Sequence, residues 1–176
     1  MKKSTFVALC GLLLPMVACS SGRQVNTMPV PSLDVPSYLG AWYEIARIDH
    51  YFEKGMTNTM AYYEANTDGT LRILNSGWKN DRYKTSEGKA KLTDTPALLR
   101  VSFFGPFYSD YRVLWISDQY HLSLVGGASA DYLWILSRTP TITNEEKQAL
   151  LTEARRRGYD TEQLVWVDQT ENINNW

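Results

Sequence analysis

The sequence has few of the residues that bind metals or form covalent cross-links. Its 176 residues include two histidines and two cysteines, which leaves little material for a metal site. We therefore expect neither a metal nor a cofactor.

The chain also lacks an excess of charge of either sign. It carries 18 Lys and Arg against 19 Asp and Glu, for a net charge of −1. This balance excludes nucleic-acid binding by bulk positive charge. A disordered chain is excluded as well, because 44% of the residues are hydrophobic and 12% are aromatic. The length fits one domain with a sizeable core.

The apolar run at the start of the chain falls short of a transmembrane helix. It extends from Phe6 to Ala18 and is interrupted by Gly11 and Pro15. A basic pair, Lys2-Lys3, precedes it. A basic start followed by a short apolar run is typical of a secretory signal peptide.

The end of this run resembles the bacterial lipobox, in which a peptidase cuts before a cysteine that then carries acyl chains. A small residue stands before the cysteine in Ala18-Cys19-Ser20. The resemblance implies a lipid anchor on Cys19, and Ser20 in place of Asp implies export to the outer membrane, where we expect the protein to face the periplasm. The alternative is a plain signal peptide with a chance cysteine.

These features divide the chain into a lipoprotein signal peptide at 1–18, a lipidated tether at 19–36 and one domain at 37–176. After cleavage, Cys19 is the only remaining cysteine. The mature domain therefore has no disulfide.

From Gly40 onward the dominant hydrophobic period is two, which predicts β-strands. Eight such segments follow one another with short turns, and no helical pattern separates them. The first segment begins at Gly40 and the third at Leu71. The other six are Thr57–Ala65, Tyr83–Thr93, Ala97–Phe103, Tyr108–Ile116, His121–Val125 and Tyr132–Ser137. An open meander would leave two unpaired edges, so the sequence predicts an all-β fold, an eight-stranded antiparallel up-and-down barrel. A barrel of this size can hold one small ligand.

One helix is predicted after the strands. Thr143 and Glu146 have the spacing of a capping box, the helix spans 144–157, and Gly158 stands at the C′ position. We expect this helix to pack outside the barrel. A short ninth strand is expected at 163–167.

Three motifs on these elements resemble those of the lipocalins. Gly40 and Trp42 match the Gly-x-Trp motif of the first strand. Asp118 and Tyr120 resemble the second motif, with Ser117 in place of Thr and one extra residue. Arg138 matches the arginine that closes the eighth strand. Together with the lipobox, the motifs point to the bacterial outer-membrane lipocalins.

Barrel closure brings the first strand and the end of the eighth together. We therefore expect Arg138 to stack on Trp42 and to seal one end of the barrel. The motif residues Gly40, Trp42, Asp118, Tyr120 and Arg138 are assigned to structure and not to ligand binding. The opposite end stays open.

Alternation, with the register that the resemblance implies, predicts which side chains line the interior. Small and aromatic side chains in this set favour a cavity over a filled core. The predicted cavity residues are Ala46, Ile48, Ala61, Tyr63, Ile73, Asn75, Ala90, Val101, Phe103, Arg112, Leu114, Leu124, Tyr132, Trp134 and Leu136.

Arg112 is the strongest head-group candidate, because a guanidinium near the open end can meet a carboxylate or a phosphodiester. The alternative is an arginine that reaches to the rim or pairs with Asp110. Tyr132 and Asn75 are secondary candidates. The linker from Phe103 to Tyr108 is unusually apolar for a loop, which is typical of a portal, a partner interface or a membrane contact.

The leading hypothesis is a binding protein without catalysis. The resemblance implies that fatty acids, phospholipids or, preferentially, lysophospholipids are held in the barrel for storage or transport in the cell envelope. Three alternatives remain: a scaffold with a filled barrel, a carrier of another hydrophobic ligand, and an enzyme that uses His50 or His121. No Gly-x-Ser-x-Gly motif is present. The resemblance also allows a homodimer.

Overall fold

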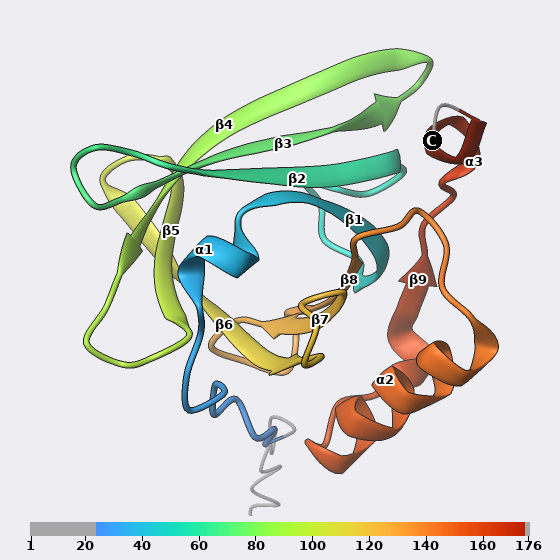
Figure 1. Cartoon of the computed structure of the whole chain (residues 1–176). Helices are drawn as coiled ribbons and strands as arrows, with labels where there is room; N and C mark the ends of the chain where they lie inside the picture. Colours follow the sequence, from blue (N-terminus) through green and yellow to red (C-terminus); the bar gives the residue numbers. More distant parts are fainter. Residues whose placement is uncertain (1–23, 175–176) are drawn as a thin grey trace, which may run out of the picture.

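The computed structural model describes residues 24–174, which form a closed barrel of eight antiparallel strands (Figure 1). Each strand pairs with the next along the chain, and β1 pairs with both β8 and β2 to close the sheet. The strands are β1 Gly40–Ile48, β2 Thr57–Ala65, β3 Leu71–Lys79, β4 Arg82–Leu92, β5 Leu98–Phe104, β6 Phe107–Ile116, β7 Leu122–Gly126 and β8 Leu133–Ser137. The predicted all-β barrel is confirmed.

The remaining elements lie outside the barrel wall or across its end. Helix α2 (Asn144–Arg156) lies beside the barrel, and β9 (Leu164–Trp166) pairs with the second half of β1. Three short elements were not predicted: α1 (Val35–Tyr38), a 3-10 turn (Thr161–Gln163) and α3 (Thr170–Asn174). None of the helices at 24–174 is long and apolar enough to cross a membrane.

Helix α2 begins and ends where the sequence indicates. The Thr143 hydroxyl accepts from the Glu146 amide, and the Glu146 carboxylate accepts from the Thr143 amide at 2.7 Å. Gly158 has a φ of +93°, a conformation that suits glycine after a helix. Leu150, Leu151 and Ala154 are buried against the barrel.

The buried apolar residues form two clusters, one on each side of the barrel wall. The interior cluster contains Trp42 and Tyr63 among others and fills the end of the barrel near α1. The outer cluster joins the wall to α2 and includes Leu114 and Leu150. Strands β1, β6, β7 and β8 contribute residues to both clusters, so both faces of these strands are buried.

Helix α1 closes one end of the barrel, where Trp42 and Arg138 meet. The Arg138 guanidinium lies 3.9 Å from the centre of the Trp42 ring. It donates to the carbonyl of Ala41 at 2.6 Å and to that of Ser37 at 2.8 Å. The Trp42 indole N–H donates to the Tyr38 carbonyl at 2.8 Å. The end near α1 is called the closed end here, and the other end the mouth.

The segment from residue 24 to α1 lies against β6 and the end of α2. The Val30 amide donates to the Val113 carbonyl at 2.9 Å. Arg157 donates to the carbonyls of Asn26 and Met28 at 3.2 and 2.8 Å. The predicted tether is thus described only from residue 24, where it contacts the domain. The signal peptide and Cys19 lie outside the described residues.

Replacing Arg138 with alanine is expected to lower the free energy of unfolding by about 2–4 kcal/mol, because a cation–π contact and several hydrogen bonds to carbonyls are lost together. Urea denaturation measures the change. Arg100→Ala is the matched control, since Arg100 is exposed and pairs with Asp110 on the surface, where such pairs contribute about 0–1 kcal/mol. Equal losses in the two variants would contradict the role given to Arg138.

Candidate functional site

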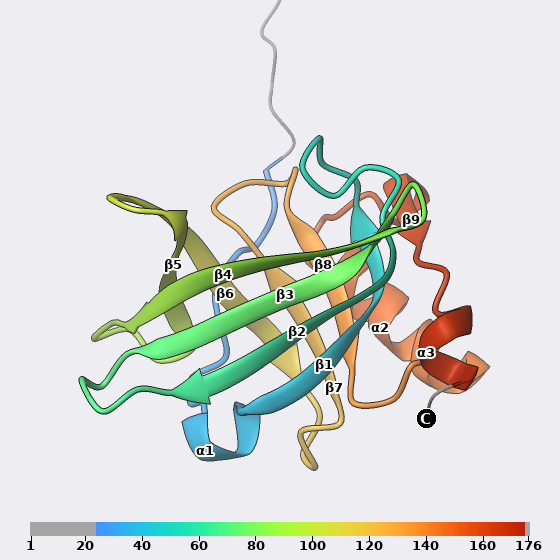
Figure 2. The ribbon, with the colours of Figure 1, turned by 90° about the horizontal axis from the view of Figure 1, so that it is seen from above.

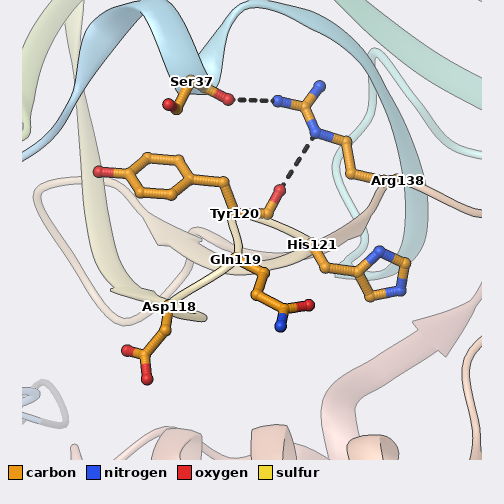
Figure 3. A pocket seen from close by; sticks show the side chains of 6 residues that line it. All are labelled: Ser37, Asp118, Gln119, Tyr120, His121 and Arg138. Carbon is orange, nitrogen blue, oxygen red and sulfur yellow. Dashed lines mark hydrogen bonds between the residues drawn. The ribbon is translucent and has the colours of Figure 1, made fainter.

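Two parts of the structure are candidates for a site: a depression at the closed end and the interior of the barrel. The depression measures about 500 Å³ and is formed by the second motif together with Arg138 (Figure 3). Its lining residues are Ser37, Asp118, Gln119, Tyr120, His121 and Arg138.

The polar groups of this depression mostly form hydrogen bonds that hold neighbouring segments of the chain together. Arg138 Nε donates to the Tyr120 carbonyl at 3.2 Å (Figure 3). The Tyr120 hydroxyl accepts from the Asp34 amide at 2.7 Å. A side chain on Gly40, whose φ is +90°, would lie 3.6 Å from Arg138 Nη1. The depression is therefore a structural junction between α1, β1 and the β6–β7 turn. The barrel interior is the stronger candidate for a ligand site.

The structure places most of the predicted cavity residues of β2 to β5 and β8 on the inner wall. They belong to the interior cluster or pack against it. These residues are Ala61, Tyr63, Ile73, Ala90, Val101, Phe103, Trp134 and Leu136. Asn75 pairs with Ala61 across β2 and β3, and its side-chain oxygen is buried without a hydrogen-bond partner.

The prediction is wrong for Ala46 and Ile48. A bulge between Glu44 and Ala46 in the pairing with β8 shifts the alternation of β1 by one residue. Both side chains therefore lie in the outer cluster. Arg47, which pairs with Trp134 across the sheet, is 1% exposed. It turns inward in their place.

The prediction is also wrong for Arg112, Leu114 and Leu124. On β6 the inner positions are Tyr111 and Val113, one residue out of register with the expectation, so Leu114 packs on α2. On β7 the neighbour Val125 lies inside, and Leu124 lies in the outer cluster.

The Arg112 guanidinium consequently lies outside the barrel. It donates to Asp110 at 2.7 Å and to the Thr27 carbonyl at 3.3 Å. The pairing with Asp110 is the alternative that the sequence left open. Arg112 holds the segment before α1 and is not placed to contact a ligand in the interior.

A polar cluster lies toward the mouth, and sequence analysis missed it. Arg47 donates to Glu44 at 2.7 Å, to Asp49 at 2.9 Å and to the Glu53 carbonyl at 2.8 Å. The Trp134 indole N–H donates to the Glu53 carboxylate at 3.2 Å. The β1–β2 loop thus turns the Glu53 side chain toward the interior. The bulge that turns Arg47 inward has no signal in the alternation pattern.

Burial shifts the titration of this cluster. It raises the pKa of Glu53 to about 8, and the nearby Glu44 adds to the rise. Burial also raises the pKa of Glu44 despite its contact with Arg47. Near neutral pH, Glu53 is therefore mostly protonated.

Three tyrosines form the polar floor of the interior. The Tyr111 hydroxyl lies 2.6 Å from that of Tyr38 and 2.8 Å from that of Tyr63. Burial raises the pKa of Tyr38 to about 12, so the hydroxyl stays neutral. Tyr111 was not predicted to face inward.

The other predicted residues, Tyr132, His50 and His121, lie near the mouth or outside the barrel. Tyr132 stacks on His50, with ring centres 4.3 Å apart. Burial lowers the pKa of His50. His121 Nε2 lies 3.8 Å from Glu146 at the closed end. Across residues 24–174, no group of three His, Cys, Asp or Glu side chains is arranged to hold a metal ion.

Comparison with known proteins agrees with this architecture. The family model of the lipocalin-like domain matches residues 33–169. The chain is 45% identical to the outer membrane lipoprotein Blc of Escherichia coli K12, over 96% of this chain and 98% of that protein. It is 37% identical to temperature-induced lipocalin-1 of Arabidopsis thaliana, over 81% and 82% of the two chains.

Solved structures show the same fold at low sequence identity. Insecticyanin from the tobacco hornworm Manduca sexta superposes with a TM-score of 0.71 at 20% identity, covering 86% of this chain and 89% of that one. The cockroach allergen Per a 4 gives a TM-score of 0.69 at 20% identity, covering 87% and 98%. The chain belongs to the lipocalin family and is similar along nearly its whole length to outer membrane lipoproteins.

Proposed function

We propose that this protein binds the acyl chain of a fatty acid or a lysophospholipid inside its barrel, at the outer membrane. The proposal rests on the composition of the barrel interior. The interior has an apolar wall, one end closed by Trp42 and Arg138, and a polar cluster toward the mouth. An apolar cavity with a few placed polar groups is the general form of a small-molecule site.

Burial of the inner wall is uneven. Ala61, Val101, Phe103 and Trp134 pack against the interior cluster but stay only partly buried. Side chains near the closed end, such as Ile73 and Leu99, are almost fully buried. An acyl chain would enter between the partly buried side chains, and each buried methylene contributes about 0.8 kcal/mol to binding.

The polar cluster suits the head-group end of such a ligand. With Glu53 protonated, the Arg47 guanidinium lies between the carboxylates of Glu44 and Asp49, so its positive charge is compensated within the cluster. Asn75 adds an unpaired buried oxygen that can accept a hydrogen bond. Head groups with a hydroxyl or an ammonium donor fit these acceptors.

The cellular context follows from the lipobox and the relatives. Outer membrane lipoproteins at 38–46% identity support location at the outer membrane. We propose that acyl chains on Cys19 hold the domain there, facing the periplasm.

Catalysis is not part of the proposal, because His50 stacks on aromatic rings and His121 contacts a carboxylate, neither of which is a nucleophile–base pair.

Filling the lumen should weaken ligand binding. Ala61→Phe places an aromatic ring on the inner wall and is expected to weaken binding of a C18 lysophospholipid at least about tenfold, the cost of roughly two lost methylene contacts. The measurement is a titration of the delipidated mature chain, followed by tryptophan fluorescence, to which Trp134 on the inner wall contributes, and by calorimetry.

The control is Tyr62→Phe, which carries the same new residue on the exposed face of the same strand. Affinity should also fall as the acyl chain is shortened. Unchanged affinity in Ala61→Phe, or no binding of any acyl chain to the wild type, would favour a scaffold with a filled barrel.

The protonation of Glu53 predicts a pH dependence of stability. Its pKa in the folded protein, about 8, lies above the ordinary value of 4.5. The folded state therefore holds a proton that the unfolded state releases, and stability is lost as pH rises from about 5 through 8. Glu53→Gln should remove this decline, so that the variant gains stability relative to the wild type at pH 9.

Urea denaturation at pH 5, 7 and 9 measures the effect. The exposed Glu162→Gln is the matched control, and its curve should follow the wild type. A decline of the same size in Glu53→Gln and the wild type would show that Glu53 is not the titrating group.

A further inference from the structure

The mouth of the barrel carries a ring of exposed aromatic side chains. Tyr51 is 88% exposed, Phe104 80% and Phe107 79%. Each of the four connections at this end carries at least one such residue, either in the loop or within two residues of it in a flanking strand. The ring, called the aromatic rim below, consists of Tyr51, Phe52, Trp78, Tyr83, Phe104, Phe107 and Tyr132.

At the closed end, Leu92 of β4 is exposed, but the turns between the strands are polar. The three turns at 66–70, 93–96 and 117–121 are rich in Asn, Asp, Thr and Gln. Across residues 24–174, none of the large apolar side chains that are exposed belongs to these turns. Exposed apolar surface costs solubility, so its concentration at one end indicates a contact there.

The path of the chain brings the predicted anchor to the same end. Tracing backward from α1, Asp34 contacts Tyr120 at the closed end, Val30 pairs with Val113 midway along β6, and Thr27 contacts Arg112, closer to the mouth. Figure 2 shows the described chain beginning at the end where the β1–β2 and β7–β8 loops project, away from α1. Five positions separate Cys19 from Gln24, a span of at most about 18 Å.

The composition of the rim fits a lipid–water interface. Aromatic side chains are favoured at that depth of a bilayer. The β5–β6 connection, Phe104-Gly105-Pro106-Phe107, has no charged residue. At the same end of the barrel, the β3–β4 hairpin carries Lys79, Arg82 and Lys84 against one acid, Asp81, and such cations are attracted to anionic phospholipid head groups.

We propose that the aromatic rim docks onto the phospholipid surface that holds the acylated Cys19, with the Phe104–Phe107 loop inserted between head groups. This inference rests on the anchor of the proposed function and adds an orientation to it. The mouth faces the bilayer, so that a lipid passes between membrane and lumen without crossing water. In this orientation the closed end of the barrel faces away from the membrane. Helix α2 lies on the side of the barrel.

The test uses the full lipidated protein in vesicles of phosphatidylethanolamine and phosphatidylglycerol. Because the mature chain has no cysteine besides Cys19, a single added thiol can carry the fluorophore NBD. One label is placed with Gly105→Cys, where a side chain meets no atom within 4 Å. The matched control is Asp94→Cys, in an exposed turn at the closed end.

The label at 105 should shift to shorter wavelength, gain intensity several-fold and be quenched by nitroxide-labelled lipid, while the label at 94 stays in water. Adding Phe104→Ser and Phe107→Ser should reverse the change at 105, although the protein still floats with the vesicles through its anchor.

Co-flotation with an aqueous signal at 105, or a stronger response at 94, would overturn the docking and leave the anchor intact. Failure of the wild type to float would refute the anchor and, with it, the docking. Neither result would bear on whether the lumen binds acyl chains.

Discussion

The stack of Arg138 on Trp42 sets one end of the barrel apart from the other. It joins the first strand to the end of the eighth, and its hydrogen bonds reach α1 and the β6–β7 turn. Because these elements are far apart in sequence, one guanidinium links the strands whose backbone pairing closes the sheet, and it seals one end of the barrel. The asymmetry between a closed end and a mouth follows from this contact, and every functional assignment uses that asymmetry.

The interior is graded along the barrel axis. The closed end is filled by apolar side chains above a floor of three tyrosine hydroxyls that satisfy one another. Toward the mouth, side chains are less buried and a charged cluster appears, in which Arg47 and Glu44 compensate each other. Burying such groups is costly unless they are paired and hydrogen-bonded, and a ligand with a polar head and an apolar tail matches the same gradient. The aromatic rim continues the pattern outward, to the surface from which such a ligand would come.

Sequence analysis predicts the order and type of the main elements well, because the strands alternate regularly and α2 carries both of its end signals. It fails where the backbone departs from strict alternation. The bulge in β1 reverses the faces of Ala46, Arg47 and Ile48. In β6, both Tyr111-x-Val113 and Arg112-x-Leu114 are acceptable inner faces, since α2 covers the outer face and makes it apolar as well. Helix α3 is fixed by contacts with distant residues, such as those of Asn58 with Glu171 and Asn172, which local patterns do not report. Helix α1 has a local signal, the Asp34 cap with Pro36 in its first turn, but its four residues are too few to show a helical period.

Native mass spectrometry decides whether the barrel holds a membrane lipid. The full-length protein is expressed with its signal sequence and extracted gently from the membrane fraction. We expect a population whose mass exceeds that of the protein by one non-covalently bound lipid with a single acyl chain, identifiable after dissociation. If no lipid is bound non-covalently, even when lysophospholipid is added in excess, the barrel is not a lipid carrier.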